Sequence, residues 1–373
     1  MAKRVILAVA GAGKTYHICH EIDPTKRNLI LAFTHENIYN IQKELCDAHG
    51  CVPELTTVST FDSFVYHQLV LPYEPSIAEH FGCPKFVSRG ICTVDPPPQT
   101  IKNSKGKPVA NPLYKKKDRL AHYVTMRGQY YCATLSELVL QVKKNRESLI
   151  KRVAARLNMF YDCVLIDEFQ DFREYDYELI MALAKKLEDV VLVGDYHQHS
   201  VSATNNSGKP FKNKKVEVSY DDFVASIIKE GFTVDVSTLA KSRRCSIDVC
   251  NYVSQKLGIW ITSSGDHTGS VIWVDDAVSI LNNNQITKLV FQEAANYSFQ
   301  ALNWSYSKGD TVDSACVILT DGLDNLDSEK FDPQKIKTST LNKLYVAMTR
   351  SRGDLYLMKA STFKTIKDSY ITR

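Results

Sequence analysis

The stretch VILAVAGAGKT, residues 5–15, decides the expected fold of the chain. It opens with five apolar residues, as a buried parallel strand does, and after the glycines the apolar residues return at helical spacing. A strand, a glycine loop and a helix start are the context of a phosphate-binding loop, because backbone N–H groups reach phosphate oxygens where no Cβ intervenes. Lys14 would then reach the terminal phosphates and Thr15 would ligate Mg²⁺. The predicted nucleotide-binding residues are Ala10, Gly11, Ala12, Gly13, Lys14 and Thr15.

Composition is that of an ordinary soluble protein, with 373 residues, 44% hydrophobic and 24% charged. A net charge of +4 permits a nucleic-acid partner without requiring one. The ten cysteines include no CxxC pair, and MAKR stands directly before the predicted strand. No apolar run approaches the length of a membrane span. We therefore expect a cytoplasmic protein with reduced thiols, no signal peptide and no membrane contact.

Strands and helices alternate along most of the chain, which favours an α/β fold with parallel sheets. We predict strands at residues 5–9, 28–34, 55–60, 160–166, 189–193, 259–261, 270–274, 288–291, 315–319 and 354–358. We predict helices at residues 35–45, 61–69, 177–187, 247–257 and 342–349. Residues 72–118 are rich in proline and residues 135–157 read as one long basic helix. The expected domains are 1–71 with 156–236, an inserted accessory region at 72–155, and 237–373 with a short insertion near 262–286.

Polar residues at strand ends supply the candidate catalytic groups. Asp167 and Glu168 follow the apolar run at 160–166, where one carboxylate can hold Mg²⁺ and the next can polarise the attacking water. We assign Asp167 to the metal and Glu168 to the water. Gln198 follows the next strand and is placed to sense the γ-phosphate. Arg244 and Arg350, from the second domain, are candidates to stabilise charge on the transferred phosphoryl group.

Taken together, these motifs resemble those of superfamily 1 helicases, specifically the UvrD/Rep/PcrA group. AVAGAGKT at 8–15, DEFQD at 167–171 and YVAMTRSR at 345–352 match its motifs closely, including the alanine at position 8. Shorter matches, in the family's order, are AFTHEN at 32–37, TFDSF at 60–64, VGDYHQ at 193–198, LAKSRR at 239–244 and SKG at 307–309. The motif IV tyrosine of the family is replaced by Arg243.

The resemblance implies two RecA-like P-loop domains in tandem that hydrolyse ATP with Mg²⁺ and move along single-stranded DNA, from 3′ to 5′. It implies that Gly309 belongs to the nucleotide site. It also implies nucleic-acid contacts by Phe33, Thr34, Thr60 and Phe64. The short stretch between motifs IV and V leaves no room for the large second accessory domain, so a compact form is expected.

Other interpretations stay open at this point. The motif V pattern is also similar to that of superfamily 1 helicases from RNA viruses, so RNA is an alternative to DNA. The chain is alternatively an NTPase switch that acts with a protein partner such as a nuclease and does not unwind processively. A nucleotide kinase or another P-loop enzyme is a third interpretation.

Overall fold

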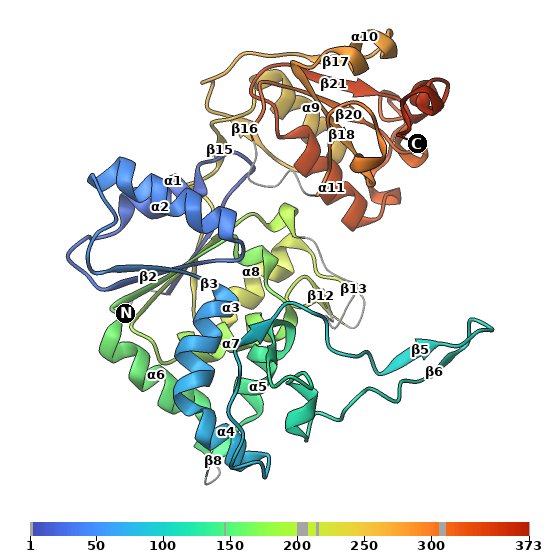
Figure 1. The fold of residues 1–373 in the computed structure, drawn as a ribbon. Helices are drawn as coiled ribbons and strands as arrows, with labels where there is room; N and C mark the ends of the chain where they lie inside the picture. The colour runs from blue at the N-terminus through green and yellow to red at the C-terminus, as the bar shows by residue number, and fades with distance from the viewer. Residues whose placement is uncertain (1–2, 145–146, 200–207, 214–215, 306–310, 373) are drawn as a thin grey trace. The chain divides into compact units, whose positions relative to one another are not determined.

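The structure is a computed structural model that describes residues 3–144, 147–199, 208–213, 216–305 and 311–372 (Figure 1). The chain forms two compact units. Unit 1 comprises residues 1–5, 18–192 and 201–233, and unit 2 comprises residues 6–17, 193–200 and 234–373. Four elements run from one unit into the other: β1 (Lys3–Leu7), α1 (Lys14–Glu21), β11 (Asp189–Gly194) and β14 (Thr233–Asp235).

The first sheet has six strands in the order β14-β1-β11-β10-β2-β3. Within unit 1, β2 (Asn28–Ala32) pairs in parallel with both β3 (Thr56–Thr60) and β10 (Cys163–Asp167). All five residues of β2 are buried, as expected of a strand covered on both faces. The carboxyl ends of these strands therefore share one sheet edge, where parallel α/β sheets carry their sites.

Among the described residues, seven α-helices lie wholly within unit 1. They are α2 (His35–His49), α3 (Phe61–Phe64), α4 (Glu74–His80), α5 (Leu135–Gln141), α6 (Leu149–Phe160), α7 (Glu174–Ala184) and α8 (Tyr220–Lys229). Four two-stranded ribbons join them: β4 (Ile91–Cys92) with β7 (Tyr130–Tyr131), β5 (Thr100–Lys102) with β6 (Pro108–Ala110), β8 (Lys143–Lys144) with β9 (Glu147–Ser148), and β12 (Lys212–Asn213) with β13 (Val216–Glu217).

Two predicted helices differ from the structure. The helix predicted over residues 135–157 is wrong, because α5 ends at Gln141 and Val142 turns to an extended conformation at ψ 128°. The chain then forms the β8–β9 ribbon, and Ser148 starts α6 anew as its N-cap by accepting a hydrogen bond from the Ile150 amide. The helix predicted over 61–69 is α-helical only to Phe64 and continues as a π-helix over Val65–Val70.

Unit 2 is built on a five-stranded sheet in the order β17-β21-β20-β18-β19, in which every pair is parallel. The strands are β17 (Val271–Trp273), β18 (Ile286–Val290), β19 (Ala301–Asn303), β20 (Ser314–Ile318) and β21 (Leu355–Met358). The helices are α9 (Ile247–Leu257), α10 (Ala277–Asn282), α11 (Thr338–Met348) and α12 (Ala360–Lys364). A short parallel pair flanks α9 in the sequence: β15 (Lys241–Ser242) precedes the helix and β16 (Thr262–Ser263) follows it.

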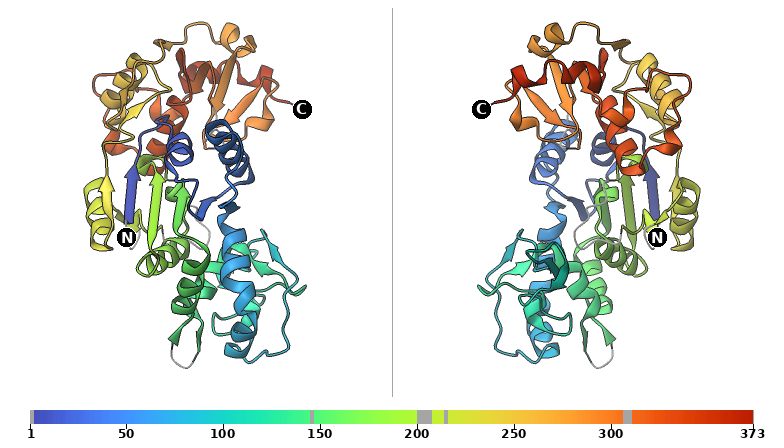
Figure 2. Two further views of the ribbon diagram at one scale, coloured as in Figure 1. Left: turned by 90° about the vertical axis from the view of Figure 1, so that its left-hand side faces the viewer. Right: turned by 90° about the vertical axis from the view of Figure 1, so that its right-hand side faces the viewer.

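Alternate residues of the unit 2 strands enter two separate cores. Leu289, Val317 and Leu357 pack with α9 and α11 on one face, while Cys316 and Met358 pack with α10 and α12 on the other. This period of two is what a strand covered on both faces requires. Unit 2 is therefore a three-layer α/β/α structure, and the predicted α/β fold class with parallel sheets is confirmed (Figure 2).

No helix in the described part of the chain combines the length and apolar character that a membrane span needs.

Candidate nucleotide and nucleic-acid sites

The phosphate loop lies in unit 2, between the end of β1 and the start of α1. Its entry is held by backbone hydrogen bonds from the Ala8 amide to the Gly194 carbonyl at 2.8 Å and from the Val9 amide to the Leu239 carbonyl at 3.0 Å. Lys14 and Thr15 are the first two residues of α1. A loop that ends at a helix N-terminus aims unpaired amides and the positive end of the helix dipole at a bound anion.

Glycine is required at Gly11 for two separate reasons. Its φ of +72° is a conformation that side chains with a Cβ rarely adopt. A Cβ there would also lie 2.6 Å from the Cβ of Arg244 and 2.8 Å from Oγ of Ser242. The Arg243 amide donates to the Gly11 carbonyl at 2.9 Å, so the backbone on both sides of the contact is fixed. Gly11 thereby lets the predicted arginine of motif IV reach the phosphate loop.

A buried tyrosine that the sequence interpretation did not assign joins the loop to motif III. The Ala10 amide donates to the hydroxyl of Tyr345 at 2.9 Å, and that hydroxyl donates to Oδ2 of Asp195 at 3.1 Å. Tyr345 lies on α11 and is fully buried, and Asp195 is 1% exposed. The signal was present in YVAMTRSR and VGDYHQ, but both residues stood beside groups with a more obvious catalytic role.

Asp195 also fixes Gln198, the predicted γ-phosphate sensor. Gln198 Nε2 donates to Asp195 Oδ2 at 2.9 Å, and the His197 amide donates to Oδ1 at 2.9 Å. Burial raises the pKa of Asp195 to about 6, although the charge of Lys14 acts in the opposite direction. Burial lowers the pKa of the neighbouring His197 to about 4. The Asp195 carboxylate therefore accepts hydrogen bonds from Tyr345, Gln198 and the His197 amide, in a buried position that disfavours its charged form.

Both predicted arginines donate to backbone carbonyls near the end of α11. Arg244 Nη1 donates to the Thr349 carbonyl at 3.2 Å, and Arg350 Nε donates to the Val346 carbonyl at 3.0 Å. Cationic side chains at a helix C-terminus satisfy its free carbonyls and complement the negative end of its dipole. Arg350 is only 2% exposed, so its guanidinium is held in place by packing as well.

Arg243 replaces the family's motif IV tyrosine in the sequence. Its guanidinium lies over the ring of Tyr16, 5.7 Å from the centroid. A guanidinium over the face of an aromatic ring is attracted to it, so this contact holds a positive charge beside the first turn of α1. Arg243, but not Tyr16, occupies the sequence position that the resemblance gives to the motif IV tyrosine.

The predicted carboxylates lie in unit 1 at the end of β10. Asp167 is 2% exposed, and its Oδ1 accepts a hydrogen bond from the Glu168 amide at 2.9 Å. Glu168 has a φ of +56°, a left-handed conformation that costs a residue with a Cβ about 1 kcal/mol or more. Gln170 Nε2 donates to Glu168 Oε2. Strained backbone is concentrated at functional sites, which is consistent with a catalytic Glu168.

The donor chemistry of the predicted residues suits magnesium. Mg²⁺ prefers oxygen ligands and is usually held by one or two protein groups together with phosphates and water. The carboxylate of Asp167 and the hydroxyl of Thr15 are such ligands. Asp167 belongs to unit 1 and Thr15 to unit 2.

Three of the four predicted nucleic-acid residues lie at the carboxyl edge of β2 and β3. Thr34 is the N-cap of α2 and accepts from the Asn37 amide at 3.1 Å. Thr60 is the N-cap of α3 and accepts from the Ser63 amide at 3.3 Å. Ala32 is the register partner of Thr60, so the two caps end adjacent strands. Phe33 lies between the last residue of β2, Ala32, and the cap Thr34, and it is partly exposed.

Phe64 differs from the other three because it is buried, at 2% exposure. It packs on Phe61, which stacks on Phe33 with 5.6 Å between ring centroids. Phe172 completes the cluster, 5.3 Å from Phe33 and 5.2 Å from Phe61. In this arrangement Phe33 offers the accessible ring, and Phe61 and Phe172 support it.

Unit 2 thus holds together the phosphate loop, Gln198, Arg244 and Arg350, whereas unit 1 holds Asp167, Glu168 and the strand-edge residues. Gly309, the predicted nucleotide contact of motif V, lies outside the described residues. The roles assigned to these residues stay predictions.

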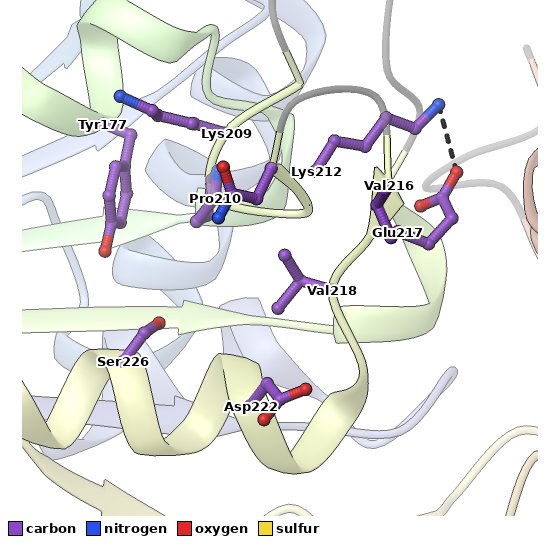
Figure 3. Close-up of a pocket in the computed structure, with 10 residues that line it drawn as sticks. Tyr177, Lys209, Pro210, Lys212, Val216, Glu217, Val218, Asp222 and Ser226 are labelled. Atoms are coloured by element: carbon purple, nitrogen blue, oxygen red, sulfur yellow. Dashed lines mark ion pairs between the residues drawn. The ribbon is translucent and has the colours of Figure 1, made fainter.

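A pocket of roughly 650 Å³ lies elsewhere in unit 1, beside α8 and the β12–β13 ribbon (Figure 3). Lys212 and Glu217 form an ion pair of 3.0 Å across that ribbon. The residues that line the pocket are Tyr177, Lys209, Pro210, Lys212, Asn213, Val216, Glu217, Val218, Asp222 and Ser226. None of the predicted site residues is among them.

Comparison with known proteins identifies a family. Residues 2–204 match the family model described as an AAA domain, AAA_19, and the chain belongs to this family. A search of curated proteins found no significant match.

Among solved structures, arterivirus nonstructural protein 10, a helicase, matches in complex with DNA, with a TM-score of 0.45, 13% identity and coverage of 95% of this chain and 60% of that one. The same helicase without DNA matches with a TM-score of 0.46, 13% identity and coverage of 95% of this chain and 59% of that one. The PRRSV helicase matches with a TM-score of 0.44, 12% identity and coverage of 98% of this chain and 54% of that one. The present chain thus spans a little over half the length of these helicases.

Proposed function

We propose that this member of the AAA domain family is an ATP-dependent translocase or helicase on single-stranded DNA. The observation that carries the proposal is the hydrogen-bonded chain from the Ala10 amide through Tyr345 and Asp195 to Gln198. It joins the phosphate loop to Gln198, which follows a neighbouring strand, and to α11, the helix that Arg350 follows two residues after its end. Such a linkage lets the presence of a γ-phosphate change the position of a helix.

In this proposal the residues divide the work of hydrolysis. Lys14 and Thr15 hold the phosphates, with Mg²⁺ on Thr15 and Asp167 to neutralise developing charge. Glu168 orients the attacking water and Gln198 senses the γ-phosphate. Arg244 and Arg350 stabilise the negative charge of the transition state, and Gly309 completes the nucleotide contacts.

The strand edge of unit 1 is the proposed nucleic-acid face. Phe33 stacks on a base, and the hydroxyls of Thr34 and Thr60, together with the amides of the helices they cap, receive phosphates. Phe64 supports this face from the core. RNA is the alternative strand, because neither stacking nor phosphate contact distinguishes it from DNA.

We further propose the domain boundaries and group predicted from the sequence. The first RecA-like domain comprises 1–71 and 156–236, the accessory region 72–155, and the second RecA-like domain 237–373. Membership of the UvrD/Rep/PcrA group and 3′-to-5′ movement belong to the same proposal. A cytoplasmic location is supported by the ten cysteines, all of which are free thiols.

The deciding experiment measures ATP turnover with no nucleic acid, with single-stranded DNA and with single-stranded RNA, together with displacement of a strand from duplexes tailed at either end. Stimulated turnover with displacement from 3′-tailed duplexes supports the proposal. Glu168→Gln should abolish turnover and retain nucleotide binding. The proposal would be overturned if the rate of ATP turnover were the same without nucleic acid, with DNA and with RNA.

The second candidate is an NTPase switch that acts with a protein partner such as a nuclease. The burial of Phe64 favours it, because Phe33 is then the accessible one of the two predicted base-stacking rings. Nucleic-acid-stimulated turnover without displacement of a strand or of bound streptavidin would support this candidate over the first.

A further inference from the structure

The β5–β6 hairpin and the segment that follows it, residues 99–116, form a charged surface that we call the basic arm. It contains Lys102, Lys105, Lys107, Lys115 and Lys116 and no acidic residue. These five charges exceed the +4 of the whole chain, so the rest of the protein is slightly acidic. Figure 1 shows the hairpin extending away from the other elements of unit 1.

The arm is ordered by backbone contacts rather than by a core. Its register pairs Thr100 with Ala110, Ile101 with Val109 and Lys102 with Pro108, and all six residues are exposed. The Asn103 side chain closes the turn by accepting from the amides of Lys105 and Lys107, at 3.0 Å each. A lone two-stranded ribbon is marginally stable in water, so an exposed one is suited to gain order from a partner.

The base of the arm is fixed to the body of unit 1. Lys117 pairs with Glu137 of α5 and donates to the hydroxyl of Tyr175 at 2.9 Å. His122 Nδ1 hydrogen-bonds the Lys115 carbonyl at 2.7 Å. Lys117 is therefore neutralised by the body. By contrast, none of the five arm lysines forms an ion pair with any residue that the structure describes.

We infer that the basic arm binds the phosphate backbones of double-stranded nucleic acid next to the single strand on which the motor acts. A two-stranded β-ribbon fits the major groove of a duplex, and unpaired lysines at its tip and base then meet phosphates on either side. Strand addition by a peptide fits less well, because Pro108 and the lysines interrupt the edges of the ribbon. The position of the duplex next to a bound single strand rests on the proposed function. The contact between the basic arm and the duplex does not.

The test measures the salt dependence of binding to a blunt 20-base-pair DNA duplex and to a single strand. A variant with Lys102→Gln, Lys105→Gln and Lys107→Gln removes three charges from exposed positions. The matched control carries Lys26→Gln, Lys186→Gln and Lys330→Gln, three exposed lysines outside the arm. Because each phosphate contact adds about 0.9 to the slope of log K against log salt, the arm variant should lose roughly 2 to 3 from the duplex slope.

The expected result is a lower duplex slope for the arm variant alone, with single-strand-stimulated turnover unchanged in both variants. Equal duplex slopes in the wild type, arm variant and control would overturn the inference and leave an acidic protein surface as the partner to examine. If the arm variant loses duplex slope but nucleic acid does not stimulate ATP turnover in the wild type, the proposed function is overturned. The arm then remains a duplex-binding element. Circular dichroism confirms that the substitutions leave the fold intact.

Discussion

At Gly11 the absence of a Cβ decides whether motif IV can approach the phosphate loop. Gly11→Ala adds a left-handed alanine, at about 1 to 2 kcal/mol, and a contact of 2.6 Å with the Arg244 Cβ. Backbone atoms hold both sides of that contact, so overpacking should add about 1 to 3 kcal/mol. We expect a clear fall in the free energy of unfolding, measured in denaturant without nucleotide.

Gly13→Ala is the matched control for this prediction. Gly13 also has a positive φ, of +82°, but its nearest neighbour would be the Cβ of Tyr16 at an ordinary 3.7 Å. Gly13→Ala should therefore lower the free energy of unfolding only by the cost of a left-handed alanine, about 1 to 2 kcal/mol. Equal losses of stability in the two variants would show that the contact with Arg244 carries no strain.

The pKa of Asp195 predicts a specific dependence of stability on pH. Because burial raises this pKa from 3.8 to about 6, the folded protein holds the proton more tightly than the unfolded chain. Its contribution to stability is therefore largest below pH 4 and is lost as the pH rises to 6. Asp195→Asn removes that loss, and its stability relative to the wild type should rise by about 2 to 3 kcal/mol from pH 4 to 6.

His197 is the control of opposite sign. Its pKa falls from 6.5 to about 4, so the folded state binds a proton less tightly and stability is lost as the pH drops through this range. His197→Gln should therefore lower stability relative to the wild type as the pH rises from 4 to 6. Thermal unfolding of both variants across this range checks the signs, and parallel curves for the two would refute the assignment.

At the scale of elements, Thr34 and Thr60 begin helices and are also the proposed phosphate contacts, and one substitution separates these roles. Thr34→Ala removes the N-cap of α2 and should cost about 1 kcal/mol of stability, whereas Thr34→Asn keeps a capping oxygen. If the hydroxyl itself binds nucleic acid, Thr34→Asn should weaken single-strand binding with stability unchanged. Binding by fluorescence anisotropy and unfolding in urea are the two measurements, and wild-type affinity in Thr34→Asn would limit Thr34 to capping.

Elements with strong local patterns were predictable from the sequence. The predicted helix over residues 247–257 coincides with α9, because Ser246 caps it and Gly258 ends it in a left-handed conformation. The break at 142–148 was not predictable, since its apolar residues keep helical spacing and only the competing cap at Ser148 divides them. The periodicity of the side chains does not report such a competition.

The candidate site was predictable in its motifs and not in its connections. Lys14, Gln198 and Arg350 could be named from the strand, loop and helix context around each of them. The bridge from Tyr345 to the Ala10 amide joins residues 335 positions apart, and it depends on how α11 packs in unit 2. No local pattern encodes a contact of that kind, so only the structure supplies it.

For the whole molecule, the proposed motor requires that hydrolysis depend on an arginine far from the phosphate loop in sequence. Arg350 is buried and donates to the end of α11, where its position is fixed. An arginine that stabilises charge on a transferred phosphoryl group contributes about 10³- to 10⁵-fold to turnover. Arg350→Lys keeps the positive charge and loses the planar fork, so kcat should fall by about 10²-fold or more while nucleotide still binds.

Arg352 provides the control, because it is exposed, lies two residues away in the same motif, and forms no ion pair among the described residues. Arg352→Lys should turn over ATP at close to the wild-type rate. Thermal unfolding separates a catalytic loss in Arg350→Lys from a folding defect, and equilibrium binding of a fluorescent ATP analogue separates it from a binding defect. If Arg350→Lys is folded, binds nucleotide and hydrolyses it as fast as Arg352→Lys, then Arg350 is a structural cap of α11 and the arginine that acts on the phosphate is Arg244 alone.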